Sequence, residues 1–174
     1  MRLKLYRKLK GVNPANPIVS GNLLINGVDF LAQDGVDAET LFEIDIEAAE
    51  PEALQIRKSI IDAMVNPNQH TYLLQDDKKR QGDLKRRRYP ATIAVETDFD
   101  PEALGYLGTL RSRYGLGDNV CGVTRYTLWH LTFREPELTT AQRRAYAEQL
   151  RDFFANPAFQ KATIFSLGIM PYIS

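Results

Sequence analysis

The chain reads IDAMVNP at residues 61–67 and RDFFANP at residues 151–157. In both stretches we expect an amphipathic helix to stop at Asn-Pro, because a proline disfavours helical geometry at the residue before it. A short apolar stretch typical of a strand follows each stop, at residues 72–74 and 163–165. The aspartate, asparagine and proline recur at one offset, since 152 − 62 = 90. This shared spacing predicts an internal repeat.

The openings of the two repeats follow the same offset. RLKLY covers residues 2–6 and TIAVE covers residues 92–96, and both alternate as strands do. A helix is expected after the second strand, with Asp100 as its cap and Pro101 at its first position. Its buried face would carry Ala103, Leu107, Leu110 and Tyr114. The matching region of the first repeat, residues 16–34, is only weakly helical because it contains glycines.

Each repeat then has a middle strand and a closing helix. Phe42, Ile44 and Ile46 form one face of the first middle strand. The second middle strand has one face with Trp129, Leu131 and Phe133, and another with Tyr126, Leu128, His130 and Thr132. The closing helices are expected over residues 52–66 and 139–156, the second capped by Thr139 or Thr140. Their apolar sides would carry Leu54, Ile61, Met64 and Val65 in the first, and Tyr146, Leu150, Phe153 and Phe154 in the second.

The predicted fold is therefore α+β, a tandem repeat of a β-α-β-α-β unit. The units span residues 1–76 and 89–174, and a basic linker spans residues 77–88. We expect antiparallel-rich sheets with helices on one face, arranged as a pseudo-dimer. The uncovered faces would pack against each other and bury the side of the second middle strand that carries Tyr126.

Composition narrows the function classes. Hydrophobic residues make up 44% and charged residues 25% of the chain, as in ordinary globular proteins. The net charge is zero, so no whole-protein field attracts nucleic acid or membranes. Cys121 is the only cysteine, which excludes an intrachain disulfide and fits a reducing compartment. No apolar run approaches the roughly 18 residues that a membrane span needs. We therefore expect a cytoplasmic protein.

Candidate catalytic groups are few. The chain has Cys121, His70 and His130, without the spacing of a metal site. Cys121 with either histidine is a conceivable nucleophile and base. The favoured interpretation is that Cys121 packs as a small apolar side chain at a strand start, and that His130 is a packed histidine. The glycine-rich stretch 115–122 precedes a strand instead of opening a helix, which favours a helix cap and loop over a phosphate site. We expect no catalytic residue, metal or cofactor.

The basic linker allows three interpretations. Residues 77–88 carry seven basic and two acidic side chains, a local net charge of +5. The first interpretation is a solvated connection between the repeats. The second is docking on an acidic protein surface or a phosphorylated ligand. The third is nucleic-acid binding, which has less support because no aromatic side chain interrupts the run.

The second repeat resembles a known family. It runs from a strand through Phe99-Asp100-Pro101 into a helix, has a middle strand that follows Gly122-Val123-Thr124-Arg125, and ends its last helix in Ala155-Asn156-Pro157. These features resemble PurS, the small subunit of formylglycinamidine ribonucleotide (FGAM) synthase in purine biosynthesis. The tandem pair is similar to the N-terminal domain of the large single-chain FGAM synthases. The resemblance covers residues 2–76 less closely than residues 89–168.

This resemblance implies a non-catalytic role. The family's PurS part bridges a synthetase (PurL-like) and a glutaminase (PurQ-like) and aids ammonia transfer within an ATP- and glutamine-dependent ligase. The chain would be a subunit or domain of that complex, whether or not it is catalytic alone. Candidate partner contacts, as hypotheses, are Asn66, Pro67, Lys85, Arg86, Arg87, Arg88, Arg125, Asn156 and Pro157. Two alternatives remain, a small-molecule-binding regulatory module with its site at the seam of the repeats, and a nucleic-acid or acidic-partner binder acting through the linker.

Overall fold

The computed structural model describes residues 1–9, 36–74, 91–131 and 139–165. The expected weak helix at 16–34, the linker at 77–88, and the strand residues Thr132 and Phe133 lie outside the described residues. The strands are β1 (Arg2–Leu9), β2 (Val36–Ile46), β3 (His70–Leu74), β4 (Ala91–Thr97), β5 (Val120–Leu131) and β6 (Gln160–Phe165). The helices are α2 (Glu50–Met64), α4 (Pro101–Ser112) and α5 (Thr140–Phe154), with a short 3-10 turn, η1 (Gly117–Asn119).

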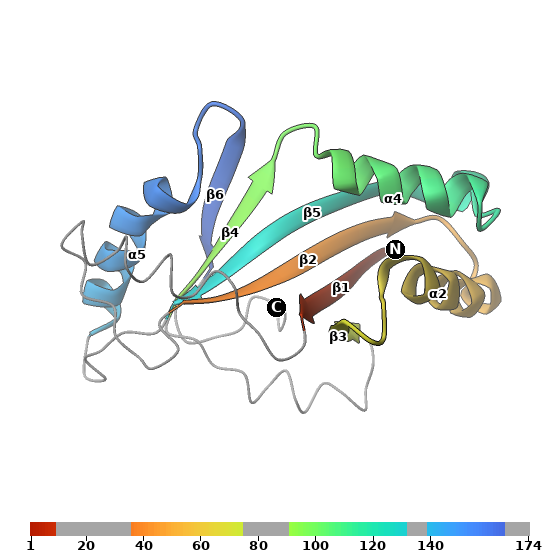
Figure 1. Ribbon diagram of the computed structural model, residues 1–174, viewed down its shortest axis with the longest axis horizontal. Helices are drawn as coiled ribbons and strands as arrows, with labels where there is room; N and C mark the ends of the chain where they lie inside the picture. Colours follow the sequence, from red (N-terminus) through yellow and green to blue (C-terminus); the bar gives the residue numbers. More distant parts are fainter. Residues whose placement is uncertain (10–35, 75–90, 132–138, 166–174) are drawn as a thin grey trace.

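The strands form one sheet of six, in the order β3-β1-β2-β5-β4-β6 (Figure 1). Every neighbouring pair is antiparallel. The two chain halves meet edge to edge, where β2 pairs with β5 from Val36↔Leu131 to Ile46↔Val120. The expectation of separate sheets packed face to face is therefore wrong. Pairing the long edges of β2 and β5 satisfies their backbone hydrogen bonds, which stacked sheets would leave exposed.

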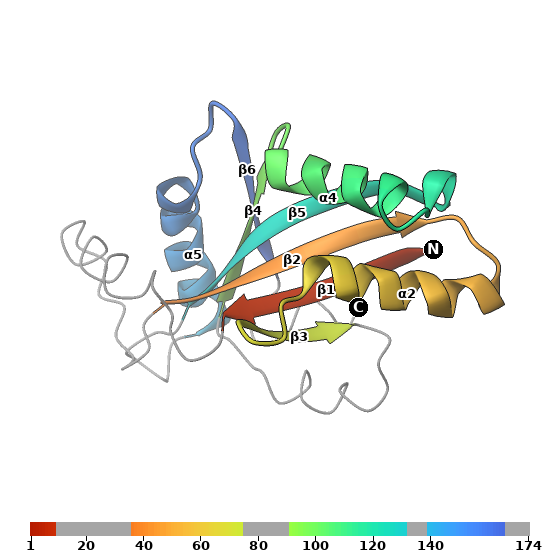
Figure 2. The same ribbon diagram turned by 45° about the vertical axis from the view of Figure 1, so that its right-hand side comes forward.

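The three helices of the described residues cover the same face of the sheet (Figure 2). The α2 and α4 helices pack side by side over a core that includes Leu5, Phe42 and Ile60, each 0% exposed. The α5 helix packs over β4 and β6 through Ala147 and Leu150, against Ile93 and Val95 and the half-buried Ile164. The strand register places these strand residues on one side of the pleat. The prediction of helices on one face is thus confirmed for the three helices described.

The opposite face of the sheet has its own apolar cluster. Tyr6, Leu41, Leu73, Ala94 and Leu128 are buried there, and Tyr126 is half-buried against them. The cluster spans β3, β1, β2, β5 and β4, so both halves of the chain contribute to it. The Tyr126 side of β5 is therefore partly covered, although not by the stacking of two sheets.

The helix boundaries follow the local signals in the sequence. Asp100 caps α4, because its Oδ1 accepts from the backbone N–H groups of Glu102 and Ala103 at 2.9 and 3.1 Å. Thr139 and Gln142 form a capping box at the start of α5. The closing helices end at Met64 and Phe154, each two residues before its asparagine. Proline excludes the helix from the residue before it, and the chain has already turned extended at the preceding cap.

Three predicted side-chain positions are wrong. Leu54 is 68% exposed, because α2 turns Ala53, Ile56, Ile60 and Met64 toward the sheet instead. Phe153 is 41% exposed at the edge of α5. Cys121 is exposed, and its Sγ donates to the carbonyl oxygen of Asp118 at 3.6 Å, so it is not packed as a small apolar residue. In these cases helical phase and the local turn decided which side chain faces the core.

The turns that follow α2 and α5 have the same hydrogen bonds. The backbone N–H of Asn66 donates to the His70 side chain, and that of Asn156 donates to the Gln160 side chain. Each asparagine Oδ1 accepts from the N–H two residues later, at 3.0 Å in both turns. Each asparagine carbonyl accepts from the N–H groups three and four residues later. Because the turns have the same bonds, β3 and β6 leave them in the same way.

Candidate partner-contact site

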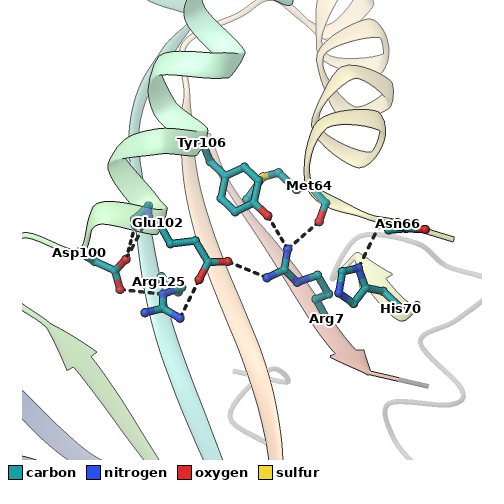
Figure 3. Close-up of polar contacts among 9 residues, drawn as sticks. Arg7, Met64, Asn66, His70, Asp100, Glu102, Tyr106 and Arg125 are labelled. Atoms are coloured by element: carbon teal, nitrogen blue, oxygen red, sulfur yellow. Dashed lines mark hydrogen bonds and ion pairs between the residues drawn. The ribbon is translucent and has the colours of Figure 1, made fainter. Parts of the chain in front are cut away.

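A chain of ion pairs joins the two halves at the centre of the helix-covered face (Figure 3). Arg125 on β5 donates from Nε to Asp100 Oδ2 at 2.7 Å, and its Nη1 lies 3.0 Å from Glu102 Oε2. Glu102 in turn accepts from Arg7 on β1 at 2.8 Å. Two arginines, one from each half, therefore hold the N-terminal turn of α4 through its two carboxylates.

Arg7 is the most connected member of this group. Its Nη1 donates to the carbonyl oxygen of Met64, at the end of α2, and to the hydroxyl of Tyr106, both at 2.8 Å. Its guanidinium also lies 4.8 Å from the centre of the Phe42 ring. Arg7 therefore ties β1, α2 and α4 together. Sequence reasoning missed it because RLKLYRKL shows only an alternating strand, and the partners are distant along the chain.

The predicted contact Arg125 is thus engaged inside the chain. Its side chain is 26% exposed, and it pairs with the cap of α4. The other predicted contacts with described positions, Asn66, Pro67, Asn156 and Pro157, are exposed in the two equivalent turns. The structure does not bring the two turns together at one site. Lys85, Arg86, Arg87 and Arg88 lie outside the described residues.

His70 closes the first of these turns. Its Nδ1 accepts from the backbone N–H of Asn66 at 3.1 Å. Burial and, second, the nearby positive charge of Arg7 lower the pKa of His70 below its ordinary value. The neutral ring that the turn requires is therefore favoured.

An exposed aromatic residue stands beside the second turn. Phe99 is 93% exposed and adopts a left-handed backbone conformation with φ of 52°. The adjacent Asp98 N–H donates to the carbonyl oxygen of Phe159, itself 47% exposed, at 2.9 Å. The loops after β4 and α5 consequently lie side by side (Figure 1). Sequence reasoning used Phe99 only as part of a motif, because neither its strain nor its exposure can be read from the residue type.

A second polar group is buried on the opposite face. Thr92 Oγ1 and His130 Nδ1 are 2.9 Å apart, and His130 Nε2 lies 3.0 Å from Glu39 Oε2. This order matches that of a nucleophile, a base and an orienting acid. However, Thr92, His130 and Glu39 are only 4%, 0% and 4% exposed, so a substrate cannot reach the hydroxyl without opening the sheet. The arrangement instead crosslinks β2, β5 and β4, and the prediction of a packed His130 is confirmed.

The glycine-rich loop ends α4 and is no part of these groups. Gly115 and Gly117 adopt positive φ of 65° and 46°. The Leu116 N–H donates to the carbonyl oxygen of Leu110, and Arg111 reaches the carbonyl oxygens of Val120 and Cys121. Two left-handed residues reverse the chain from α4 into β5. The interpretation as a helix end followed by a loop is confirmed.

Neither a metal site nor a membrane-spanning helix is found among the described residues, and two comparisons with known proteins give no match. Within the described ranges, no group of three or more metal-ligating side chains converges. None of the helices described is both long enough and apolar enough to cross a membrane. A scan against protein-family models finds no match to this chain, and a search of curated proteins finds none either.

Proposed function

We propose that this chain is a cytoplasmic, non-catalytic assembly module of an FGAM synthase, which holds a synthetase and a glutaminase together and aids ammonia transfer between them. The sequence resemblance to PurS motivates the choice of enzyme. The arrangement of the surface around α4 supports a role in binding another protein.

The proposal includes a common origin for the two halves as a fused pseudo-dimer. The sheet order β3-β1-β2 in one half is mirrored by β6-β4-β5 in the other. The turns at Asn66 and Asn156 share their hydrogen bonds at the offset of 90, which supports two copies of one unit. The predicted offset of 90 is wrong for the opening strands, because Leu9 pairs with His70 and Thr97 with Gln160, which relates β1 to β4 at an offset of 97 − 9 = 88.

The exposure of the Phe99 ring, together with its left-handed backbone, is the observation that supports the assembly role. A left-handed conformation in a residue other than glycine costs on the order of 1 kcal/mol. In the isolated chain the 93% exposed ring offsets none of this cost through burial. Burying a phenylalanine in a partner contributes about 1.5–3 kcal/mol. Phe99 combines an exposed ring with a strained backbone, next to Asp100, which caps α4 and pairs with Arg125, so the ring is suited to fill a pocket of another protein.

The test is light scattering with size-exclusion chromatography on the chain mixed with the synthetase and glutaminase of the same organism. Wild type is expected to co-elute with at least one of them. Phe99→Asn should stabilise the isolated chain by about 0.5–1 kcal/mol, because asparagine tolerates the left-handed region. The same change should weaken the complex about tenfold or more.

A matched control is Leu54→Gln, which removes an exposed apolar side chain from α2. This variant should bind as wild type does. Failure of wild type to co-elute with either enzyme at micromolar concentration refutes the FGAM synthase assignment. Equal binding by Phe99→Asn and wild type refutes Phe99 as the contact.

A further inference from the structure

A cavity lies on the face of the sheet opposite α2, α4 and α5. Its volume is about 280 Å³, at the small end for ligand pockets. Tyr6, Leu41 and Ala94 line it, and all three are buried members of the apolar cluster on that face. Because β1, β2 and β4 each supply one of these residues, both halves of the chain build the cavity.

Charged side chains cross this cavity in an ordered row. Lys4 on β1 lies opposite Glu43 on β2, and Glu96 on β4 lies opposite Lys161 on β6. Tyr126 on β5 stands between the two carboxylates and is the direct neighbour of Glu96. From β1 to β6 the polar lining is therefore, in order, an ammonium, a carboxylate, the Tyr126 hydroxyl, a carboxylate and an ammonium. The formal charges of the lining cancel.

The two ends of the row differ. Glu43 lies 3.6 Å from both Lys4 and Arg2, and the Tyr126 hydroxyl donates to it at 3.5 Å. Glu96 and Lys161, in contrast, form no ion pair with any of the described residues, although they are direct cross-strand neighbours. Opposed charges on neighbouring strands lie close enough to pair. At one end of the cavity the charge of Glu43 is thus neutralised by ion pairs within the chain. At the other end the carboxylate of Glu96 and the ammonium of Lys161 lie side by side.

We propose that this cavity binds a small zwitterion of the free α-amino-acid class. The ligand ammonium contacts Glu96, its carboxylate contacts Lys161, and its side chain lies over Tyr6, Leu41 and Ala94. An α-amino acid carries its ammonium and its carboxylate on the same carbon, which matches the carboxylate of Glu96 and the ammonium of Lys161 on adjacent strands. An amine would leave Lys161 without a counterion, and a simple carboxylate would leave Glu96 without one.

Tyr126 supports this assignment because its hydroxyl lines the cavity as an uncharged polar group. Burial and, second, the charges of Glu43 and Glu96 raise the pKa of Tyr126 to about 12. The hydroxyl is therefore protonated at neutral pH and adds no third negative charge beside the ammonium. The proposal does not depend on the assembly function, since it involves the other face of the sheet.

The experiment is a thermal-shift series on the full chain with each standard L-amino acid at roughly 10 mM, followed by calorimetry for those that raise the Tm. At least one amino acid is expected to bind. Glu96→Gln and Lys161→Met should each weaken it about tenfold, the usual effect of removing a charge-assisted hydrogen bond. The decarboxylated amine and the N-acetyl derivative of that amino acid should bind at least tenfold more weakly.

The matched controls are Glu148→Gln and Lys58→Met, which neutralise exposed side chains on the helices outside the cavity. Both should bind the amino acid as wild type does. No shift with any amino acid overturns the proposal. So does equal affinity in the cavity variants and wild type, and equal affinity for the amine contradicts the role of Lys161.

Discussion

The ion pairs around Asp100 should make this residue a main support of the helix-covered face. Asp100 is 6% exposed and performs two tasks, since one oxygen caps α4 and the other accepts from Arg125. Loss of an N-cap costs typically about 1 kcal/mol. Loss of the charged hydrogen bond adds about 1–2 kcal/mol, because Arg125 keeps Glu102 as a second partner. Asp100→Ala should therefore destabilise the chain by about 2–3 kcal/mol.

Asp100→Asn separates the two tasks. Asparagine caps a helix about as well as aspartate, so this variant should lose only the ion-pair part, about 1–2 kcal/mol. Urea unfolding followed by circular dichroism measures both values. In thermal scans Asp100→Ala should lower the Tm by about 4–12 °C for a chain of this size. A double-mutant cycle with Arg125→Met should give a coupling of about 1 kcal/mol or more.

The surface pair Arg144–Glu148 provides the control. Its side chains are 73% and 51% exposed, so Glu148→Ala should change stability by less than about 0.5 kcal/mol. The reasoning fails if Asp100→Asn matches wild type within about 0.3 kcal/mol. It also fails if Asp100 and Arg125 are additive in the cycle, because their direct contact would then contribute nothing.

Two further predictions concern His70 and two glycines, Gly108 and Gly115. The folded-state pKa of His70 lies below its unfolded value near 6.5, so its contribution is complete above that pH and is lost as pH falls toward the folded pKa. Replacing His70 by Gln keeps an acceptor for Asn66 and should reduce the loss of stability as pH falls below about 6.5 relative to wild type, measured by urea unfolding; an unchanged slope contradicts this role. Gly115→Ala should destabilise by about 1 kcal/mol because of its positive φ, although no atom within 4 Å blocks a methyl group there. Gly108→Ala, in the middle of α4 with equal space, should stabilise by about 0.5–1 kcal/mol, and effects of the same sign in both variants would refute the conformational argument.

Local features of the sequence determined the elements and several of their ends. Alternation predicted β1 and β4, and Asp100-Pro101 predicted the start of α4 together with its cap. The two Asn-Pro stretches predicted where α2 and α5 stop. These signals act through the φ restriction of proline, side-chain hydrogen bonds to nearby N–H groups and the period of the strand, so each can be read within a few residues.

The tertiary structure alone decided how these elements combine. Two separate sheets and one continuous sheet bury similar strand faces, and the sequence could not select the pairing of β2 with β5 because backbone hydrogen bonds are independent of residue type. The same pairing brings Arg7 and Arg125 together on the helix-covered face, where both contact Glu102, although they are 118 residues apart (125 − 7 = 118). It also sets Lys4, Glu43, Glu96 and Lys161 in one row on the other face. Both groups of charges therefore depend on strand register, which long-range pairing fixes and no local pattern encodes.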